Sequence, residues 1–181
     1  TIPVVDLAPL IAGADGAQAK AAAEVEAACA SVAFFFVKNH GVPQAMLDGI
    51  IEQSARFHGQ SMAEKNKVKV SRDLLGYLPA GGQMQRNSIY NKSTRRESSA
   101  SFYCRRQLPD DHPDQIAGKL WTHSNRWPEN LPGFRENVQA YFDALDELLG
   151  RLLLLFSITL GMGPDFLTSH EAFSPPNPNL R

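Results

Sequence analysis

Cationic side chains gather between residues 86 and 106 of this 181-residue chain, where they could bind an anion. Arginine suits that task, because its planar guanidinium pairs with a carboxylate through two parallel hydrogen bonds. Two interpretations stay open: a solvated basic loop, or a segment from which one or two cations reach a substrate carboxylate. The acidic residue of this segment is Glu97, and its cations are Arg86, Lys92, Arg95, Arg96, Arg105 and Arg106.

Other reactive residue types carry weaker chemical arguments. Cys104 has no base at a diagnostic spacing, so we do not expect a nucleophilic thiol. No glycine-rich phosphate loop precedes a predicted helix, which excludes nucleotide-dependent chemistry of that kind. Trp121 and Trp127 could form a stacking platform, but packing in a core or at its rim is the simpler interpretation.

The composition is that of one ordinary globular domain, or of part of one. Hydrophobic residues make up 43% of the chain and charged residues 20%, and the formal net charge is −1. Binding nucleic acid or a membrane over a whole face needs a basic excess, so a small-molecule partner fits better. Cys29 and Cys104 are the two cysteines, and no signal sequence or long apolar run is found, so we expect a reducing cytoplasm.

Strand and helix patterns alternate through the N-terminal third of the chain. Residues 2–7 alternate weakly around a proline and predict an edge strand. An alanine-rich stretch with apolar residues at helical spacing predicts a helix over 17–32. The aromatic run over 33–38 predicts a buried strand, and the pattern after Pro43 predicts a helix that ends near Gly59.

The turn between that strand and the next helix contains Asn39, His40 and Gly41. A catalytic role for the two polar residues is one interpretation. We prefer a structural one, in which Asn39 and His40 satisfy backbone groups at the turn and Gly41 supplies a positive φ.

The rest of the chain begins with a capping box and contains a long helix. Ser61 and Glu64 predict the start of a short helix that runs to about Val70. No period holds over 71–132, so we expect a long irregular connection of the kind that covers a functional site. Apolar residues at helical spacing predict one helix over 134–161. Its second half is apolar on every side, so another part of the protein must cover it.

Short motifs in a fixed order run along almost the whole chain. The most distinctive is Phe34-Phe35-Phe36-Val37-Lys38-Asn39-His40-Gly41-Val42. The others are Ile2-Pro3-Val4-Val5-Asp6-Leu7, Ala63-Glu64-Lys65, Gly76-Tyr77, Ser101-Phe102, Asp111-His112-Pro113, Thr122-His123, Trp127-Pro128, Pro132-Gly133-Phe134 and Asn179-Leu180-Arg181. Together they resemble the N-terminal region of the non-haem iron, 2-oxoglutarate-dependent oxygenases of the isopenicillin N synthase type.

The resemblance implies a fold and a reaction. The fold is α+β: residues 1–181 form a helical N-terminal region whose edge strands belong to a double-stranded β-helix, or jelly-roll, oxygenase. Most barrel strands, and the catalytic core, are then expected after residue 181. The implied reaction uses Fe(II), dioxygen and 2-oxoglutarate, which is decarboxylated, to hydroxylate, desaturate or ring-close a small, carboxylate-bearing substrate. The alternative is a non-catalytic, truncated homologue that acts as a binding module.

The family's iron ligands are two histidines and a carboxylate, and the resemblance places them on barrel strands beyond Arg181. Inside the chain, His112-Pro113-Asp114 has the local spacing, with His170 as a distant partner. We reject that triad, because His112 lies in an irregular acidic segment rather than on a rigid strand. Arg96-Glu97-Ser98 has the same residue types and spacing as the Arg-x-Ser pair that binds 2-oxoglutarate in many relatives. That pair belongs to a late barrel strand, so its occurrence in this irregular connection indicates coincidence. We therefore expect no catalytic or metal-binding residue within residues 1–181.

Substrate contacts are the site residues that the resemblance assigns to this chain. In enzymes of the isopenicillin N synthase type, the residues after Ser-Phe line the substrate pocket, which points to Tyr103 and Arg105. Tyr77 could also face the site, although an aromatic residue after glycine is as often packed. Isopenicillin N synthase has an arginine for its tripeptide's carboxylate two residues before the glycine of Gly76-Tyr77, where this chain has Leu74. That tripeptide is therefore not the expected substrate.

Overall fold

The structure is a computed structural model, and it describes residues 1–70, 74–82, 98–119, 124–169 and 178–181. The chain forms two compact units. The first unit is Thr1–Ile50 with Gln139–Pro176, and the second unit is Ile51–Val138 with Asn177–Arg181. Helices α3 (Gln44–His58) and α6 (Phe134–Thr159) contribute residues to both units.

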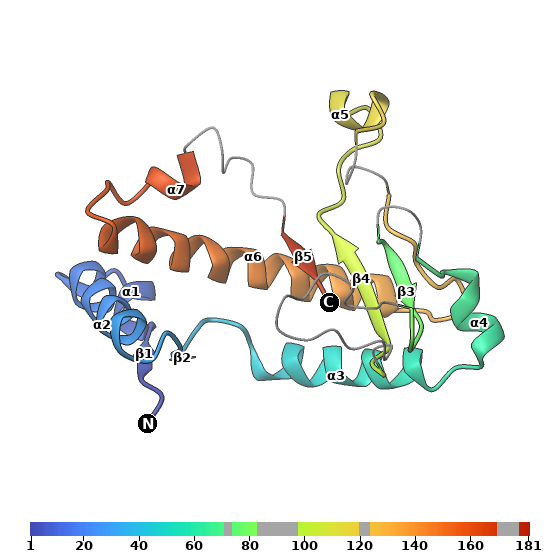
Figure 1. The fold of residues 1–181 in the computed structure, drawn as a ribbon, viewed down its shortest axis with the longest axis horizontal. Coiled ribbons are helices and arrows are strands. Elements are labelled where there is room, and N and C mark those ends of the chain that lie inside the picture. Colours follow the sequence, from blue (N-terminus) through green and yellow to red (C-terminus); the bar gives the residue numbers. More distant parts are fainter. Residues whose placement is uncertain (71–73, 83–97, 120–123, 170–177) are drawn as a thin grey trace, which may run out of the picture. The chain divides into compact units, whose positions relative to one another are not determined.

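The first unit contains helices and a two-stranded parallel sheet (Figure 1). Strand β1 (Val4–Asp6) pairs with β2 (Phe36–Lys38), so that Val5 lies opposite Val37. The connection between these parallel strands includes α2 (Ala17–Ser31), which confirms the helix predicted from the alanine-rich pattern. Two short helices were not predicted: α1 (Ala8–Ile11) and α7 (Phe166–Ser169).

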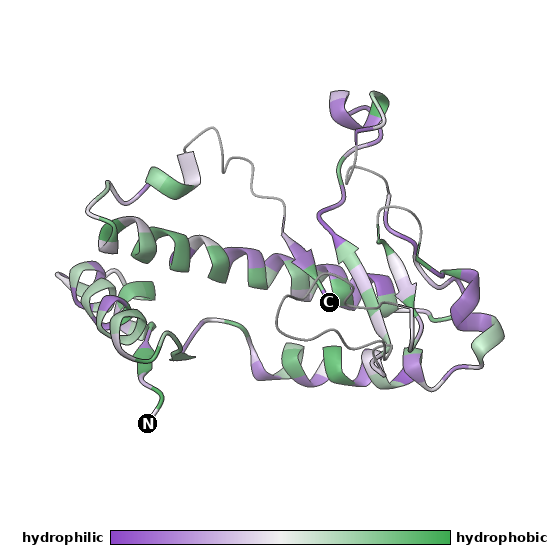
Figure 2. Cartoon of the chain, in the orientation of Figure 1, coloured by the Kyte–Doolittle hydropathy of each residue, from purple (hydrophilic) through white to green (hydrophobic). Residues whose placement is uncertain are grey.

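The core of the first unit is formed by β1, α2 and the C-terminal half of α6. Val5, Leu7, Val25 and Leu155 are each at most 1% exposed. Figure 2 shows apolar residues along β1 and along the C-terminal half of α6. Part of the apolar surface that was predicted to need a cover is therefore buried within this unit, although Leu160 stays 63% exposed.

The aromatic strand is not buried on both faces, so that prediction is wrong. Phe34 and Phe36 are 70% and 60% exposed, and Val4, the partner of Phe36 in β1, is 53% exposed. Successive side chains of a strand point to opposite faces, and only the face with Phe35 and Val37 packs against the core. The other face of β1 and β2 exposes Val4 and Phe36 beside the Asp6–Lys38 ion pair.

The turn after β2 is held by side-chain hydrogen bonds. His40 Nδ1 accepts from the Val42 N–H at 3.1 Å, and Gly41 has a φ of 88°, as the structural interpretation predicted. Asn39 differs, because its Nδ2 donates to Asp6 Oδ1 at 2.9 Å rather than to a backbone group. Asn39 itself has a φ of 53°, a conformation that asparagine tolerates better than most residues.

Asp6 should make the stability of the first unit depend on pH. Hydrogen bonds from the Asn39 amide and the Ala8 N–H, together with Lys38, lower the pKa of Asp6 from 3.8 to about 2. A carboxyl with a lowered folded-state pKa contributes stability above its unfolded pKa and loses that contribution as the pH falls through the folded value. We expect the wild-type protein to lose more stability than Asp6→Asn between about pH 5 and pH 2. Urea unfolding followed by circular dichroism tests this, and parallel pH profiles would contradict it.

The second unit contains a three-stranded antiparallel sheet of order β3-β4-β5. Strand β4 (Ser101–Arg105) is central and pairs with β3 (Gly76–Leu78) and with β5 (Asn179–Leu180). These strands and α5 (Pro113–Ile116) correct the prediction of a wholly irregular connection over 71–132. Strands this short produce no clear period, and their pairing joins residues that are far apart in the sequence.

Aromatic rings pack against one face of this sheet. Phe57 of α3 is 1% exposed, and the ring centroids of Phe102, Phe134 and Tyr77 lie 5.0, 5.4 and 5.7 Å from its own. Trp127 extends the cluster, 6.0 Å from Phe102. Tilted and edge-to-face arrangements of this kind add to the energy of burial. The cluster therefore holds α3, the start of α6 and the sheet together within the second unit.

Helix α4 (Met62–Lys67) begins with the predicted cap, since Ser61 Oγ accepts from the Glu64 N–H at 3.2 Å. It ends before Val70, because the chain turns to pair with β3. The Tyr77 N–H donates to the Val68 carbonyl at 2.7 Å, and the Val70 N–H donates to the Tyr77 carbonyl at 2.8 Å. The segment after α4 thus lies directly against the backbone of β3.

The long helix α6 confirms the prediction over 134–161. It ends just before Gly161, whose φ of 71° suits the left-handed residue that terminates many helices. None of the helices in the described ranges has an apolar stretch long enough to cross a bilayer.

Candidate functional site

Strands β3 and β4 divide the three predicted substrate residues between two faces of the sheet. Side chains alternate along a strand, so Tyr103 and Arg105 share one face of β4, and Phe102 lies on the other. Tyr77 lies directly opposite Phe102 in the register, and such pairs share a face. The structure therefore brings Tyr103 and Arg105 together, and it places Tyr77 on the opposite face.

Tyr77 belongs to the aromatic cluster. It is 2% exposed, and Lys65 Nζ lies 5.7 Å from its ring centroid. Its hydroxyl lies 3.9 Å from the sulfur of Met62. These are the surroundings of a packed side chain.

The backbone of Arg105 is positioned by a side chain from a distant segment. Asn125 Oδ1 accepts from the Arg105 N–H at 2.9 Å, and Asn125 Nδ2 donates to the Arg105 carbonyl at 2.8 Å. Gln107 Oε1 accepts from the Asn125 N–H at 3.2 Å, which orients Asn125 in turn. The Asn125 amide thus acts like one residue of a neighbouring strand at the end of β4. No local pattern marks Asn125 in the sequence, because it lies where no period holds.

Arg181, which follows β5, joins the face that carries Tyr103. Its guanidinium carbon lies 5.5 Å from the Tyr103 ring centroid, and its Nε donates to Ser101 Oγ at 2.9 Å. The motif Asn179-Leu180-Arg181 pointed to this residue only as a family element. No local pattern relates it to Ser101, since the two residues are 80 positions apart.

The charges on this face favour an anion. Arg105 pairs with Asn179, so Arg181 is its diagonal neighbour on the adjoining strand, a geometry in which Cα atoms lie about 7–8 Å apart. Strands β3, β4 and β5 contain no Asp or Glu. We call the face with Ser101, Tyr103, Arg105 and Arg181 the arginine face.

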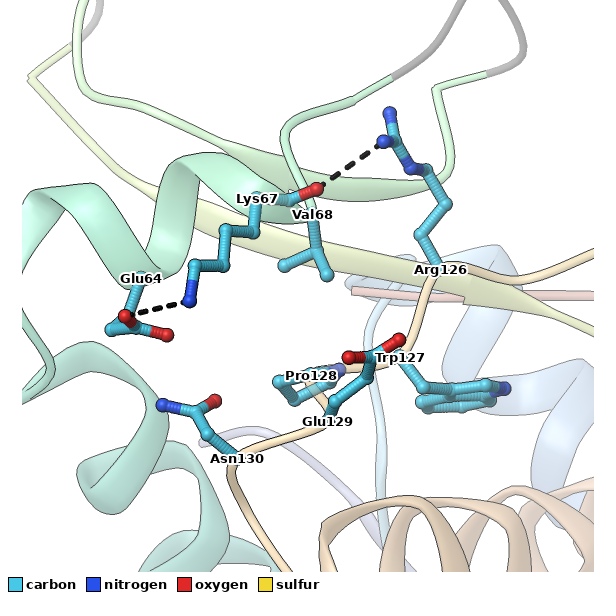
Figure 3. A pocket seen from close by; sticks show the side chains of 8 residues that line it. All are labelled: Glu64, Lys67, Val68, Arg126, Trp127, Pro128, Glu129 and Asn130. Carbon is cyan, nitrogen blue, oxygen red and sulfur yellow. Dashed lines mark hydrogen bonds and ion pairs between the residues drawn. The ribbon is translucent and has the colours of Figure 1, made fainter.

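A separate pocket of about 440 Å³ lies between α4 and residues 126–130 of the second unit (Figure 3). Lys67 pairs with Glu64 at 2.8 Å, and Arg126 donates to the Lys67 and Lys69 carbonyls, so these charges have partners within the chain. None of the predicted site residues lines this pocket, which makes it a weaker candidate. Its lining residues are Glu64, Lys67, Val68, Arg126, Trp127, Pro128, Glu129 and Asn130.

The rejected metal triad includes two residues that take part in the local structure of α5. His112 Nδ1 accepts from the Asp114 N–H at 3.2 Å. The Asp114 carboxylate pairs with Lys119, whose hydrogen bond and charge lower the pKa of Asp114. Within the described ranges, no three His, Cys, Asp or Glu side chains gather as metal ligands. Other predicted candidates lie outside the described residues: His170, Arg86, Lys92, Arg95, Arg96 and Trp121.

Cys104 is buried on the face of β4 opposite Arg105. Burial raises the pKa of its thiol to about 12, so the thiol stays protonated at neutral pH. A thiolate is the nucleophilic form of cysteine, so the environment of Cys104 agrees with the prediction that it is not a nucleophile.

This chain is similar to known non-haem iron oxygenases over most of its length. The family model described as the N-terminal region of non-haem dioxygenase in morphine synthesis matches residues 2–130. Isopenicillin N synthase from Streptomyces clavuligerus is 29% identical over 168 residues, which cover 91% of this chain and 49% of that protein. The chain spans about half the length of the curated relatives it matches.

Solved structures match over most of the chain. A 2OG-Fe(II) oxygenase family protein from Caulobacter crescentus has a TM-score of 0.74 at 20% identity, over 92% of this chain and 51% of that one, which shows the fold. The structure of JOX2 in complex with 2OG, Fe and JA has a TM-score of 0.68 at 27% identity. That match covers 98% of this chain and 45% of JOX2.

Proposed function

We propose that this chain is the mostly helical N-terminal part of an oxygenase that acts on a small, carboxylate-bearing molecule. The chain belongs to the family of non-haem dioxygenase N-terminal regions. The cofactors of this family are Fe(II) and 2-oxoglutarate. When bound, they would activate dioxygen, which is the oxidant of the reaction. The part proposed for this chain is to bind and orient the substrate.

The arginine face is the observation that carries this proposal. Tyr103 and Arg105 were predicted as substrate residues, and they lie on one face of one strand. A guanidinium binds a carboxylate through charge-assisted hydrogen bonds, and a fixed backbone lowers the entropy lost when the anion binds. Asn125 supplies that fixed backbone at Arg105. The neighbouring Arg181 adds a second positive charge to the face.

The iron ligands, a His-x-Asp pair and a distant histidine, are proposed to lie on a C-terminal barrel beyond residue 181. No three His, Cys, Asp or Glu side chains gather in the part of the chain that the structure describes, and relatives are about twice as long as this chain. The exposed apolar side chains of Val4, Phe34 and Phe36 form a surface that such a barrel would cover. Barrel strands that pair with an edge of β1 or β2 would also make the pair part of a larger sheet, which suits parallel strands.

The reaction type is proposed at the level of the family. Hydroxylation, desaturation and ring closure all remain within the proposal, and ring closure of the isopenicillin N synthase type would need no 2-oxoglutarate. A cytoplasmic location stays a prediction. The rival function is a non-catalytic homologue that uses the same fold to bind a partner.

The test uses Arg105→Ala in the protein expressed from its complete coding sequence. Benzoate serves as a carboxylate probe, and benzamide is its uncharged counterpart. We expect Arg105→Ala to weaken benzoate binding at least about tenfold while bound iron stays near one per protein, because the arginine touches the anion and not the metal. Binding is measured by NMR of ¹⁵N-labelled arginine side chains, and iron by elemental analysis.

Arg135→Ala is the matched control, because Arg135 is an exposed arginine of the same unit near Trp127. It should leave benzoate affinity unchanged. Unchanged affinity in Arg105→Ala would remove the substrate role of Arg105. A complete protein that binds no iron would favour the non-catalytic rival.

A further inference from the structure

Strand β5 brings a residue from the C-terminal end of the chain onto the arginine face. The register pairs Leu180 with Cys104 and Asn179 with Arg105, so Arg181 lies across from Tyr103. Besides its contacts with the Tyr103 ring and Ser101, Arg181 donates from Nη2 to Ser99 Oγ at 3.4 Å. One guanidinium thus contacts three residues in and just before β4.

Arginine suits the geometry of these contacts. The flat face of a guanidinium can lie on an aromatic ring while its N–H groups donate in the plane of the fork. A lysine ammonium can approach a ring, but it has no planar edge with which to hold a ring and two hydroxyl groups together. Besides adding charge, contacts of this kind would restrict the orientation of the Tyr103 ring.

The Tyr103 ring lies next to Arg105, the proposed anion-binding residue. Tyr103 is 7% exposed and lies two positions from Arg105 on the same face of β4. A change of the Tyr103 rotamer would change the surface that lies beside the Arg105 side chain. A ring fixed before the ligand arrives lowers the cost of binding.

We propose that Arg181 is a positioning residue for carboxylate recognition. It holds the Tyr103 ring and the Ser101 hydroxyl against β4. A carboxylate bound by Arg105 would then contact a Tyr103 ring that is already in place, and it would lie near the second positive charge, that of Arg181. This inference rests on the proposed function, because it assumes that Arg105 binds a carboxylate on this face.

The experiment measures benzoate and benzamide binding to the Arg181→Lys variant of the complete protein. The variant keeps the positive charge and loses the planar fork. We expect benzoate affinity to fall at least about tenfold, with benzamide affinity and iron content unchanged. Arg135→Lys is the matched control, because its guanidinium lies 6.0 Å from the Trp127 ring, away from the arginine face. It should bind benzoate like the wild type.

The possible results separate this inference from the proposed function. Wild-type benzoate affinity in Arg181→Lys, with or without a lower melting temperature, would overturn the positioning role. If Arg105→Ala weakens binding and Arg181→Lys does not, only this inference fails. If Arg105→Ala has no effect, the proposed function of the face fails first. Should Arg181→Lys not fold, Ser101→Ala removes the acceptor of Arg181 Nε, and unchanged affinity in that variant would also overturn the inference.

Discussion

Gly76→Ala is expected to unfold the second unit. A Cβ at position 76 would lie 2.2 Å from the Val68 carbonyl oxygen, which is backbone and cannot move aside without breaking its hydrogen bond from Tyr77. Gly76 also has a φ of 103°, which an L-residue rarely adopts. The clash and the strain together should cost more than about 3 kcal/mol, a large share of the stability of a small domain. Urea unfolding followed by tryptophan fluorescence measures this, since Trp127 lies in the second unit.

Gly118→Ala separates the two effects. Gly118 has a φ of 60°, and no atom lies within 4 Å of the position that its Cβ would take. This variant should lose only about 1–2 kcal/mol, the cost of a left-handed conformation. Similar losses in both variants would mean that the close approach of Val68 does not explain the glycine at position 76.

Phe57→Ala should cost about 3–5 kcal/mol of unfolding free energy, the range seen when a buried phenylalanine is truncated. The side chain is 1% exposed and contacts rings from β3, β4 and α6, so its removal leaves a cavity that several elements would have to fill. The measurement is again urea unfolding with tryptophan fluorescence, because Trp127 lies at the edge of the same cluster.

Ile51→Ala is the control on the same helix. Ile51 is 67% exposed, so its truncation should change stability by less than about 0.5 kcal/mol. If Phe57→Ala were as mild as Ile51→Ala, the aromatic cluster would not be the core of the second unit.

The helices were the part of the fold that could be predicted best. Ala17–Ser31 and Phe134–Thr159 follow patterns in which each residue relates to others three or four positions away, so a short window contains the whole signal. The cap at Ser61 is equally local. Burial was harder to predict: the aromatic run over 33–38 predicts a buried strand, but only the face with Phe35 and Val37 packs against the core in the described structure.

The sheet of the second unit could not be predicted from local patterns. Its strands have three, five and two residues, too few for alternation to stand out from an irregular connection. Pairing them requires contacts across long separations, such as the hydrogen bond between Arg181 and Ser101. The closeness of Val68 to Gly76 likewise became visible only in three dimensions.

The sequence alone determined the family, through motifs, and it identified Tyr103 and Arg105 as candidates, through their place after Ser-Phe. Only the tertiary structure decided that these two residues share a face, that Tyr77 lies on the other face and that Arg181 joins them. The physical reason is that residue type and helical periodicity are properties of neighbouring positions. The side on which a strand residue lies depends on its register with strands elsewhere in the chain, and a shift of one residue would reverse it.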